Sequence, residues 1–194
     1  MFPVNVPNVL TVLRILLVPV LVVALLDETP NGDVFAAIVF AAASLTDMLD
    51  GYLARSRNAI TTFGKLMDPI ADKLLIIAAL VALVSLGRLA AWVAMVVIAR
   101  EFAVTALRMA ATSQGVVISA SPFGKAKTCF QIAMVLALIA EKSAPLWVDL
   151  LTYVTVAITI ASGADYFFGL RKRLGEKDRA ARLAAGKTTD PPAA

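Results

Sequence analysis

The sequence contains no histidine and a single cysteine among its 194 residues. The absence of histidine excludes an imidazole base, a phosphohistidine intermediate and a histidine metal ligand. The lone Cys129 cannot form an intramolecular disulfide, and its apolar surroundings favour a small packed core residue over a nucleophile. Phosphoryl chemistry in this chain would therefore depend on carboxylates and metal ions.

Charged residues are also few, at 16% of the chain against 60% hydrophobic residues. This balance is typical of membrane proteins rather than of soluble domains. Apolar runs of about 17–25 residues are long enough to cross a bilayer. Such runs occur at residues 9–26, 34–55, 63–86, 89–111, 123–140 and 146–170. The predicted fold class is therefore all-α, an integral membrane bundle of six transmembrane helices.

The chain is expected to divide into a bundle at residues 1–170 and a basic cytoplasmic tail at residues 171–194. We expect the tail to be partly disordered and to approach anionic lipid head groups of the bilayer. The stretch SQGVVISASPFGK, before the fifth run, contains Gly, Ser and Pro and predicts irregular structure. The start, MFPVNVPNVL, has no Lys or Arg, unlike a secretory signal peptide, so the first run is expected in the mature protein.

Lysine and arginine predict the orientation. They gather between the second and third runs, between the fourth and fifth, and in the tail. The opposite side has only Arg88 and Lys142, beside the acidic loop DETPNGD. Because Lys and Arg gather in cytoplasmic loops, both termini are expected in the cytoplasm. The same bias accounts for the net charge of +4 without a nucleic-acid partner.

Four aspartates interrupt this apolar chain. Asp47 and Asp50 are three residues apart and Asp68 and Asp72 are four apart, so each pair shares one helix face. Helices joined by a short connection are antiparallel neighbours, so both pairs are expected near one cytoplasmic end. An alternative is that these acids pair with nearby lysines and arginines at a helix interface.

Four carboxylates at one depth repel one another unless protons or cations intervene. Oxygen ligands favour hard ions, Mg²⁺ or Mn²⁺, over zinc. Two such ions about 3.5–4 Å apart commonly serve displacement at phosphorus. Gly51 and Gly64 remove side chains where a ligand or helix backbone comes close, and Ala54 keeps the surface beside Asp50 shallow. The pattern thus predicts a two-metal site.

The complete pattern resembles the signature of the CDP-alcohol phosphotransferase family. It reads Asp47-x-x-Asp50-Gly51-x-x-Ala54-Arg55, then eight residues, then Gly64-x-x-x-Asp68-x-x-x-Asp72. The segments NVPNVLTVLR, FGKLMDPIADK, REF and GKAKT are similar to the branch that accepts sn-glycerol 3-phosphate. The resemblance covers the chain up to about residue 170.

The resemblance implies a six-helix enzyme, commonly a homodimer, in the bacterial inner membrane with its active site at the cytoplasmic face. It implies transfer of a phosphatidyl group from CDP-diacylglycerol to an alcohol with two divalent cations. Asp47, Asp50 and Asp68 would hold the ions, and Asp72 would contact one ion and act as general base.

The resemblance also implies residues that bind the CDP-lipid. Gly51, Ala54 and Arg55 would line the cytidine diphosphate site, beside Gly64. Separately, Asn8, Thr11 and Arg14 lie near the start of the first run, within reach of a cytoplasmic nucleotide. Helix capping and interfacial anchoring are the alternative for these three residues.

An acceptor that carries a phosphate needs cations. Arg108, Lys125 and Lys127 lie at the predicted cytoplasmic ends of the fourth and fifth runs, where forked Arg contacts or compact Lys charges would hold phosphate. Their alternative is ordinary positive-inside bias. Arg100 and Glu101 fall well inside the fourth run, where isolated charges are costly, and an ion pair with other helices would explain them.

The sequence is also compatible with other functions. Asp165 is expected to partner a neighbouring Arg rather than to act as a fifth ligand. A phosphatidylinositol phosphate synthase or a cardiolipin synthase would use the same chemistry. From other classes, intramembrane carboxylates also mark divalent cation transporters, and a noncatalytic membrane scaffold is a further possibility.

Overall fold

The computed structural model describes residues 6–27, 29, 31–57, 62–113, 122–143 and 145–187. Residues 6–8, 47–57, 62–69, 71–72, 122–123, 125, 177–178 and 180–187 are described by their backbone alone. This part of the chain contains helices and no strand: α1 Val6–Leu26, α2 Gly32–Arg57, α3 Thr62–Ser85, α4 Ala91–Ser113, α5 Pro122–Ala140 and α6 Leu146–Lys187. Each helix coincides with one predicted apolar run, and all ends but the last agree within three residues. The predicted irregular loop falls mainly on residues 114–121, outside the described residues.

A glycine turn ends α3. Gly87 has φ of 69°, a left-handed conformation that costs other L residues about 1–2 kcal/mol. The Gly87 amide donates to the Val84 carbonyl at 3.0 Å and the Arg88 amide to the Leu83 carbonyl at 2.9 Å. This pair of bonds is the Schellman pattern, which satisfies the last carbonyls of a helix. The turn reverses the chain into α4.

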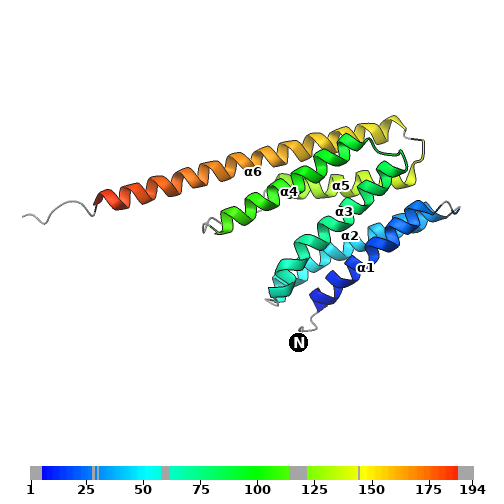
Figure 1. Ribbon diagram of the computed structural model, residues 1–194, viewed down its shortest axis with the longest axis horizontal. Helices are drawn as coiled ribbons and strands as arrows, with labels where there is room; N and C mark the ends of the chain where they lie inside the picture. Colours follow the sequence, from blue (N-terminus) through cyan, green and yellow to red (C-terminus); the bar gives the residue numbers. More distant parts are fainter. Residues whose placement is uncertain are drawn as a thin grey trace, which may run out of the picture.

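The last helix is longer than the sequence predicted. A partly disordered tail was expected from residue 171, but α6 continues to Lys187 and extends beyond the other helices (Figure 1). One reason is packing, because Leu170 is buried with Ala111 of α4 and Leu174 borders the same cluster. Beyond this cluster the sequence is rich in Ala, Arg, Lys and Glu, which favour helix. The first part of the tail is therefore an extension of α6.

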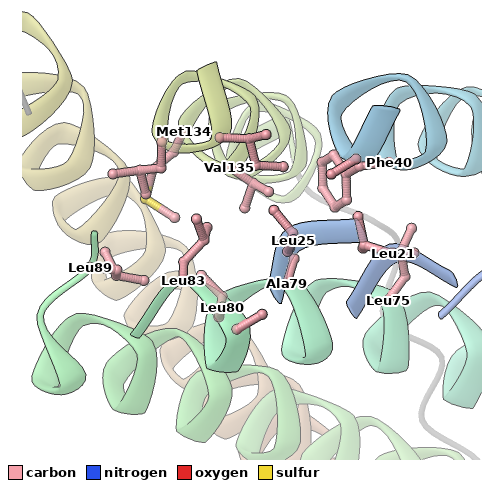
Figure 2. Packing of buried hydrophobic residues seen from close by; sticks show 14 of the residues in the cluster. Leu21, Leu25, Phe40, Leu75, Ala79, Leu80, Leu83, Leu89, Met134 and Val135 are labelled. Atoms are coloured by element: carbon pink, nitrogen blue, oxygen red, sulfur yellow. The ribbon is translucent and has the colours of Figure 1, made fainter. Parts of the chain in front are cut away.

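The main core includes buried residues from all six helices, and its centre lies between α1, α2, α3 and α5 (Figure 2). Leu21, Phe40, Leu80, Met134 and Val135 are fully buried there, and in Figure 2 their side chains converge from the four helices. Tight packing of this kind holds helices together even where the surroundings are as apolar as the core.

The helices form two groups. α1 packs along both α2 and α3, α6 packs along both α4 and α5, and α2 joins the groups through α5. In Figure 1 the groups meet at the right and separate towards the left, where α2 ends, α3 begins and α4 ends. Within the described residues α2 and α3 touch each other over only a short stretch, since α1 lies against both. α1 therefore shares in forming the end that carries the aspartates.

The outward faces of the helices are apolar. On α1, Val9, Leu13, Leu16, Val20 and Val23 are 40–66% exposed, and their spacing of three or four residues makes a stripe along the helix. A large exposed apolar surface marks contact with lipid or with another protein.

Two described helical segments, Val9–Leu26 and Leu146–Glu176, are long and apolar enough to cross a membrane. Shorter apolar segments lie in α2, α3 and α5, at residues 32–46, 73–85 and 126–140. The charges of Arg100 and Glu101 interrupt α4. Six helices are thus confirmed within the described part of the chain, and two of its segments qualify as membrane spans by length and hydropathy.

Cys129 is exposed, which corrects the expectation of a packed core residue. α5 turns Lys127 and Gln131 inward, and both are nearly fully buried. Cys129, Ala133 and Ala140 are exposed. They are spaced four and seven residues apart, which places them on the same outward face of α5. The inward positions are taken by the residues that bind other helices.

Asp33, Arg88 and Lys142 interact at the end of the bundle that lies opposite the aspartates. The Asp33 carboxylate accepts from Arg88 at 2.8 and 3.3 Å and lies 2.6 Å from the Lys142 ammonium. Arg88 also donates to the Ile139 carbonyl at 3.1 Å. Partial burial would raise the pKa of Asp33, but the hydrogen bonds and charges of Arg88 and Lys142 outweigh burial and lower it. The group ties the start of α2 to the α3–α4 turn and the end of α5.

Candidate active site

The four aspartates lie on the helices that the sequence predicted. Asp47 and Asp50 are on the second half of α2, and Asp68 and Asp72 are on the first half of α3. Because the two helices run in opposite directions, these halves lie at the same end of the bundle (Figure 1). The carboxylates themselves fall outside the described side chains, so their meeting at one depth stays a prediction.

The donor set fits a hard divalent cation. Carboxylate oxygens are the protein ligands that Mg²⁺ and Mn²⁺ prefer, and the chain has no histidine that would favour zinc. Among the side chains that the structure describes, no group of three or more Asp, Glu or Cys residues is placed to hold a metal. The aspartates of α2 and α3 are therefore the candidate ligand set.

Two polar residues of α1 lie in the interior near these aspartates. Thr11 and Arg14 are each 2% exposed, and both interact with other groups of the protein. Ser44, on α2, is also buried, and its hydroxyl has no hydrogen-bond partner among the described residues. The burial of Thr11 and Arg14 excludes a role as interfacial anchors and leaves them facing the interior of the bundle.

The other residues predicted to bind the CDP-lipid are placed by their backbone alone. Asn8 lies in the first turn of α1, at the same end of the bundle as the aspartates. Gly51, Ala54 and Arg55 follow Asp50 on α2, and Gly64 lies in the first turn of α3. Their side chains are outside the described set, so their roles stay predictions.

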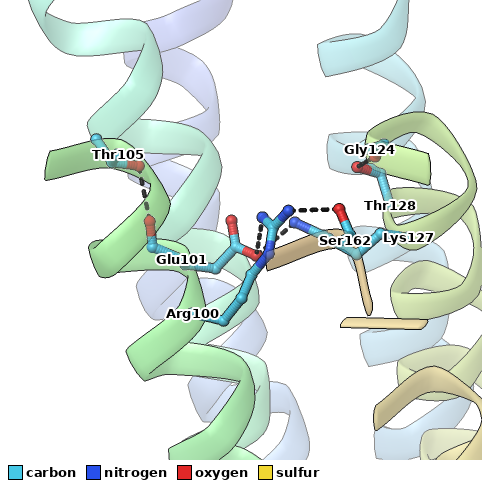
Figure 3. Close-up of polar contacts among 7 residues, drawn as sticks. All are labelled: Arg100, Glu101, Thr105, Gly124, Lys127, Thr128 and Ser162. Carbon is cyan, nitrogen blue, oxygen red and sulfur yellow. Dashed lines mark hydrogen bonds and ion pairs between the residues drawn. The ribbon is translucent and has the colours of Figure 1, made fainter. Parts of the chain in front are cut away.

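A buried cluster of charges joins α4, α5 and α6 (Figure 3). Lys127 of α5 forms an ion pair with Glu101 of α4, and Arg100 Nη1 lies 3.3 Å from the same carboxylate oxygen. Arg100 Nη2 donates to Ser162 Oγ of α6 at 2.7 Å. The three charged side chains are only 8–14% exposed. The ion pair with another helix that the sequence left open for Glu101 is confirmed.

The cluster does not neutralise itself, because it sets two cations against one carboxylate. Arg100 Nε has no hydrogen-bond partner among the described residues, while the buried Gln131 lies beside the Glu101 carboxylate. Lys73 of α3, which adjoins Asp72, is close enough for its charge to act on Lys127. Buried donors without acceptors are uncommon in proteins, and with a net positive charge they fit an anionic ligand or ordered water.

The three residues predicted to bind an acceptor phosphate lie at different depths. Lys127 is buried in the cluster, whereas Arg108 is exposed near the end of α4 with its guanidinium carbon 5.7 Å from the centre of the Tyr166 ring. Arg108 follows Glu101 by seven residues, which keeps it on the same face of α4 and about 10 Å further along. Lys125 lies in the first turn of α5, and its side chain is outside the described set.

Asp165 does not form the expected ion pair with a neighbouring arginine of the described residues. It is exposed on α6, and no ion pair joins it to any residue in the described part of the chain. Ala161 and Phe168, four residues before it and three after it, are exposed as well, so this face of α6 points away from α4 and α5. The predicted arginine partner is therefore absent from the described residues.

Sequence reasoning missed Ser162 and Gln131. Ser162 belongs to a series of buried hydroxyls on α6 at spacings of three and four residues, together with Thr152, Thr155 and Thr159. Small polar residues on one face of an apolar helix mark a helix-packing surface, so the spacing alone was a usable signal. Gln131 has no such signal, because its apolar neighbours hide the face to which it belongs.

Comparisons with known proteins agree with this architecture. The sequence profile described as CDP-alcohol phosphatidyltransferase matches residues 4–161, from α1 into α6. The CDP-diacylglycerol–glycerol-3-phosphate 3-phosphatidyltransferase of Bacillus subtilis (strain 168) is 42% identical over 181 residues, covering 84% of this chain and 93% of the relative. The probable phosphatidylglycerophosphate synthase of Mycobacterium tuberculosis (strain ATCC 25618 / H37Rv) is 41% identical over 167 residues, covering 84% and 79%.

A more distant relative extends the agreement. The CDP-diacylglycerol–glycerol-3-phosphate 3-phosphatidyltransferase of Rickettsia bellii (strain RML369-C) is 34% identical over 174 residues, which are 87% of this chain and 96% of the relative. Fold, carboxylate pattern and relatives together define an all-helical, membrane-associated transferase. The chain belongs to the CDP-alcohol phosphatidyltransferase family.

Proposed function

We propose that this chain transfers the phosphatidyl group of CDP-diacylglycerol to sn-glycerol 3-phosphate, giving phosphatidylglycerophosphate and CMP. The observation that carries the proposal is the complete aspartate signature, on two antiparallel helices, in a chain whose relatives at 34–42% identity are named for this reaction. No observation favours a cation transporter or a noncatalytic scaffold over this reaction.

The proposed chemistry begins with a proton transfer. An alcohol is a poor nucleophile until a nearby carboxylate takes its proton as it attacks, and Asp72 is the proposed base. The hydroxyl oxygen forms a bond to the phosphorus of the phosphatidyl phosphate. The bond between that phosphorus and the CMP oxygen breaks, and CMP leaves with the electron pair.

The four aspartates are proposed to hold two divalent cations, Mg²⁺ or Mn²⁺, through Asp47, Asp50, Asp68 and Asp72. When bound, the cations supply charge neutralisation to the phosphoryl oxygens and to the departing CMP. Support comes from the oxygen-only donor set and from the position of both pairs at one end of α2 and α3.

The nucleotide is proposed to lie beside these aspartates, against α1, α2 and α3. The buried Thr11 and Arg14 supply polar groups on α1. Gly51 and Gly64 leave room for the diphosphate to approach the backbone of α2 and α3. Asn8, Ala54 and Arg55 complete the proposed contacts.

The phosphate of the acceptor is proposed to bind between α4 and α5, through Arg108, Lys125 and Lys127. Support comes from the net positive charge around Lys127, the unpaired Nε of Arg100 in the same cluster, and the influence of Lys73 next to the proposed base. Arg offers two parallel hydrogen bonds to phosphate and Lys a compact charge. A neutral acceptor would leave the buried cluster of Arg100, Lys127 and Glu101 with one positive charge in excess.

We also propose that all six helices cross the bilayer, with both termini and the active site on the cytoplasmic side of the inner membrane. The apolar outward stripe of α1 and the placement of Lys and Arg near the aspartate end support this orientation. The homodimer implied by the resemblance stays a prediction.

An acceptor screen tests the proposed reaction. Purified protein is incubated with CDP-diacylglycerol and Mg²⁺ together with sn-glycerol 3-phosphate, inositol phosphate or phosphatidylglycerol, and the lipids are resolved by mass. We expect phosphatidylglycerophosphate from the first acceptor. A phosphatidylinositol phosphate or cardiolipin as the main product would replace the proposal by one of the two related synthase activities, and divalent-ion flux in liposomes that ignores CDP-lipid would favour a transporter.

A further inference from the structure

We infer that Glu101 is a positioning residue for the proposed reaction, which holds the Lys127 ammonium as a fixed positive charge at the wall of the acceptor-phosphate site. The inference rests on the proposed function, in which Lys127 faces the phosphate of the acceptor. Glu101 acts through Lys127 and does not itself contact either substrate.

The surroundings of Lys127 would otherwise oppose its charge. Its side chain is 8% exposed, and the charges of Arg100 and Lys73 repel it. Glu101 is the carboxylate among the described residues that acts on it. A buried ammonium without a counter-charge either moves towards water or gives up its proton. In either case the acceptor site would lose a positive charge at this position.

Glu101 is itself held in place from two sides. Arg100 reaches its carboxylate at 3.3 Å and is anchored on α6 by the 2.7 Å hydrogen bond to Ser162 (Figure 3). The Arg100 side chain also packs on α6 at Gly163, where a Cβ would lie 3.4 Å from Arg100 Cγ, an ordinary contact distance. The position of the Lys127 ammonium is therefore set by a series of contacts across α6, α4 and α5. These contacts restrict the Lys127 ammonium more strongly than a surface ion pair would, because the side chains of a surface pair stay mobile.

Lys127 keeps donors for a second partner. An ammonium carries three hydrogens, and the ion pair with Glu101 engages one of them. Arg100 Nε, buried nearby, also lacks an acceptor among the described residues. A phosphate oxygen beside Lys127 would meet several donors at once, while Glu101 fixes the ammonium from behind.

The test compares Glu101→Gln, Lys127→Met and the double variant of the full-length protein in detergent. KM for sn-glycerol 3-phosphate, KM for CDP-diacylglycerol, kcat and Tm are measured for each. We expect Glu101→Gln to raise the KM for the acceptor about tenfold or more, the effect of losing one charged hydrogen bond, and to change the KM for the lipid less than about twofold. The double variant should match Lys127→Met, since a residue that acts through another has no effect once that residue is gone.

Two further variants separate positioning from folding. Glu101→Asp keeps the charge on a side chain shorter by one methylene, so it should raise the KM for the acceptor by a measurable but smaller factor than Glu101→Gln does, about two- to fivefold. Asp33→Asn breaks a comparable ion pair at the opposite end of the bundle and should lower Tm without changing the KM for the acceptor. If Glu101→Gln does not fold, Glu101→Asp alone decides: a KM for the acceptor equal to that of the wild type, together with a lowered Tm, overturns the inference.

Other results overturn it as well. These are an unchanged KM for the acceptor in folded Glu101→Gln, equal increases in KM for both substrates, or effects of the single variants that multiply in the double variant. If the wild type does not use sn-glycerol 3-phosphate, the proposed function fails by itself, and the same variants are then measured with the phosphate-bearing acceptor that it does use. An acceptor without a phosphate overturns both.

Discussion

Arg88 and Asp33 join the α3–α4 turn to the first turn of α2 through two hydrogen bonds of 2.8 and 3.3 Å, at the end of the bundle opposite the aspartates. The two side chains are 13% and 16% exposed, so solvent screens them only in part. Because the proposed chemistry takes place at the other end, stability and activity should respond separately to changes in this pair.

Removal of the Arg88 guanidinium should destabilise the protein without impairing catalysis. Arg88→Met leaves Asp33 with Lys142 alone and deletes the bond to the Ile139 carbonyl, and we expect a loss of about 1–3 kcal/mol in unfolding free energy. Denaturant titration in detergent measures it. The matched control is Lys142→Met, whose side chain is 68% exposed and should cost less than about 1 kcal/mol. Equal losses of unfolding free energy in Arg88→Met and Lys142→Met would contradict the expectation that the less exposed ion pair contributes more to stability.

The Asp33 carboxyl predicts how stability depends on pH. Its pKa in the folded protein lies below the ordinary value of 3.8, so ionised Asp33 stabilises the native state above that pH. The contribution is lost as the pH falls below 3.8 and through the lowered pKa. The difference in Tm between wild type and Asp33→Asn should therefore be full at neutral pH and shrink below about pH 4. A difference that grows on acidification would mean that the pKa is raised instead.

Gly87 and Gly175 allow the cost of backbone conformation to be measured apart from the cost of steric crowding. A Cβ at Gly87 or at Gly175 meets no atom within 4 Å, but only Gly87 has a positive φ, of 69°. We expect Gly87→Ala to cost about 1–2 kcal/mol and Gly175→Ala, inside α6, to be neutral or to stabilise by up to about 1 kcal/mol. Thermal unfolding of both variants is the measurement, and similar shifts in the two would refute the glycine turn after α3.

Metal binding by the aspartates can be measured apart from turnover. We expect Mn²⁺ titration, followed by electron paramagnetic resonance, to show binding to the wild type that is weakened at least tenfold in Asp68→Asn, because one carboxylate ligand is lost. Asp165→Asn is the matched control, since this exposed aspartate lies on α6 away from the predicted site. Equal Mn²⁺ affinity in the wild type, Asp68→Asn and Asp165→Asn would contradict the assignment of Asp68 as a metal ligand.

The helices and the aspartate placement were predictable because each depends on local sequence. Apolar runs long enough to span a bilayer fix where helices form, and spacings of three and four residues fix which aspartates share a face. The end of α6 was not predictable from hydrophobicity, because its last turns are charged. Their helical state depends on intrinsic propensity and on the contact between Leu170 and Ala111.

The partners of buried charges were not predictable for a different reason. Lys127 and Glu101 are 26 residues apart in sequence, and no periodicity relates residues on different helices. Cys129 was misplaced because α5 is apolar on nearly all sides, so its pattern does not distinguish an inward from an outward face. The partner of Lys127 and the exposure of Cys129 both depend on which helices pack together, which the sequence does not show.

The central claim is that Asp72 serves transfer of a phosphatidyl group to sn-glycerol 3-phosphate. The most direct test is CMP release from CDP-diacylglycerol by purified protein with Mg²⁺, with and without this acceptor, for wild type and Asp72→Asn. We predict release by the wild type that requires the acceptor, matches the phosphatidylglycerophosphate formed, and falls at least about a hundredfold in the variant. Release by Asp72→Asn at the wild-type rate, or by the wild type without any acceptor, would contradict the account.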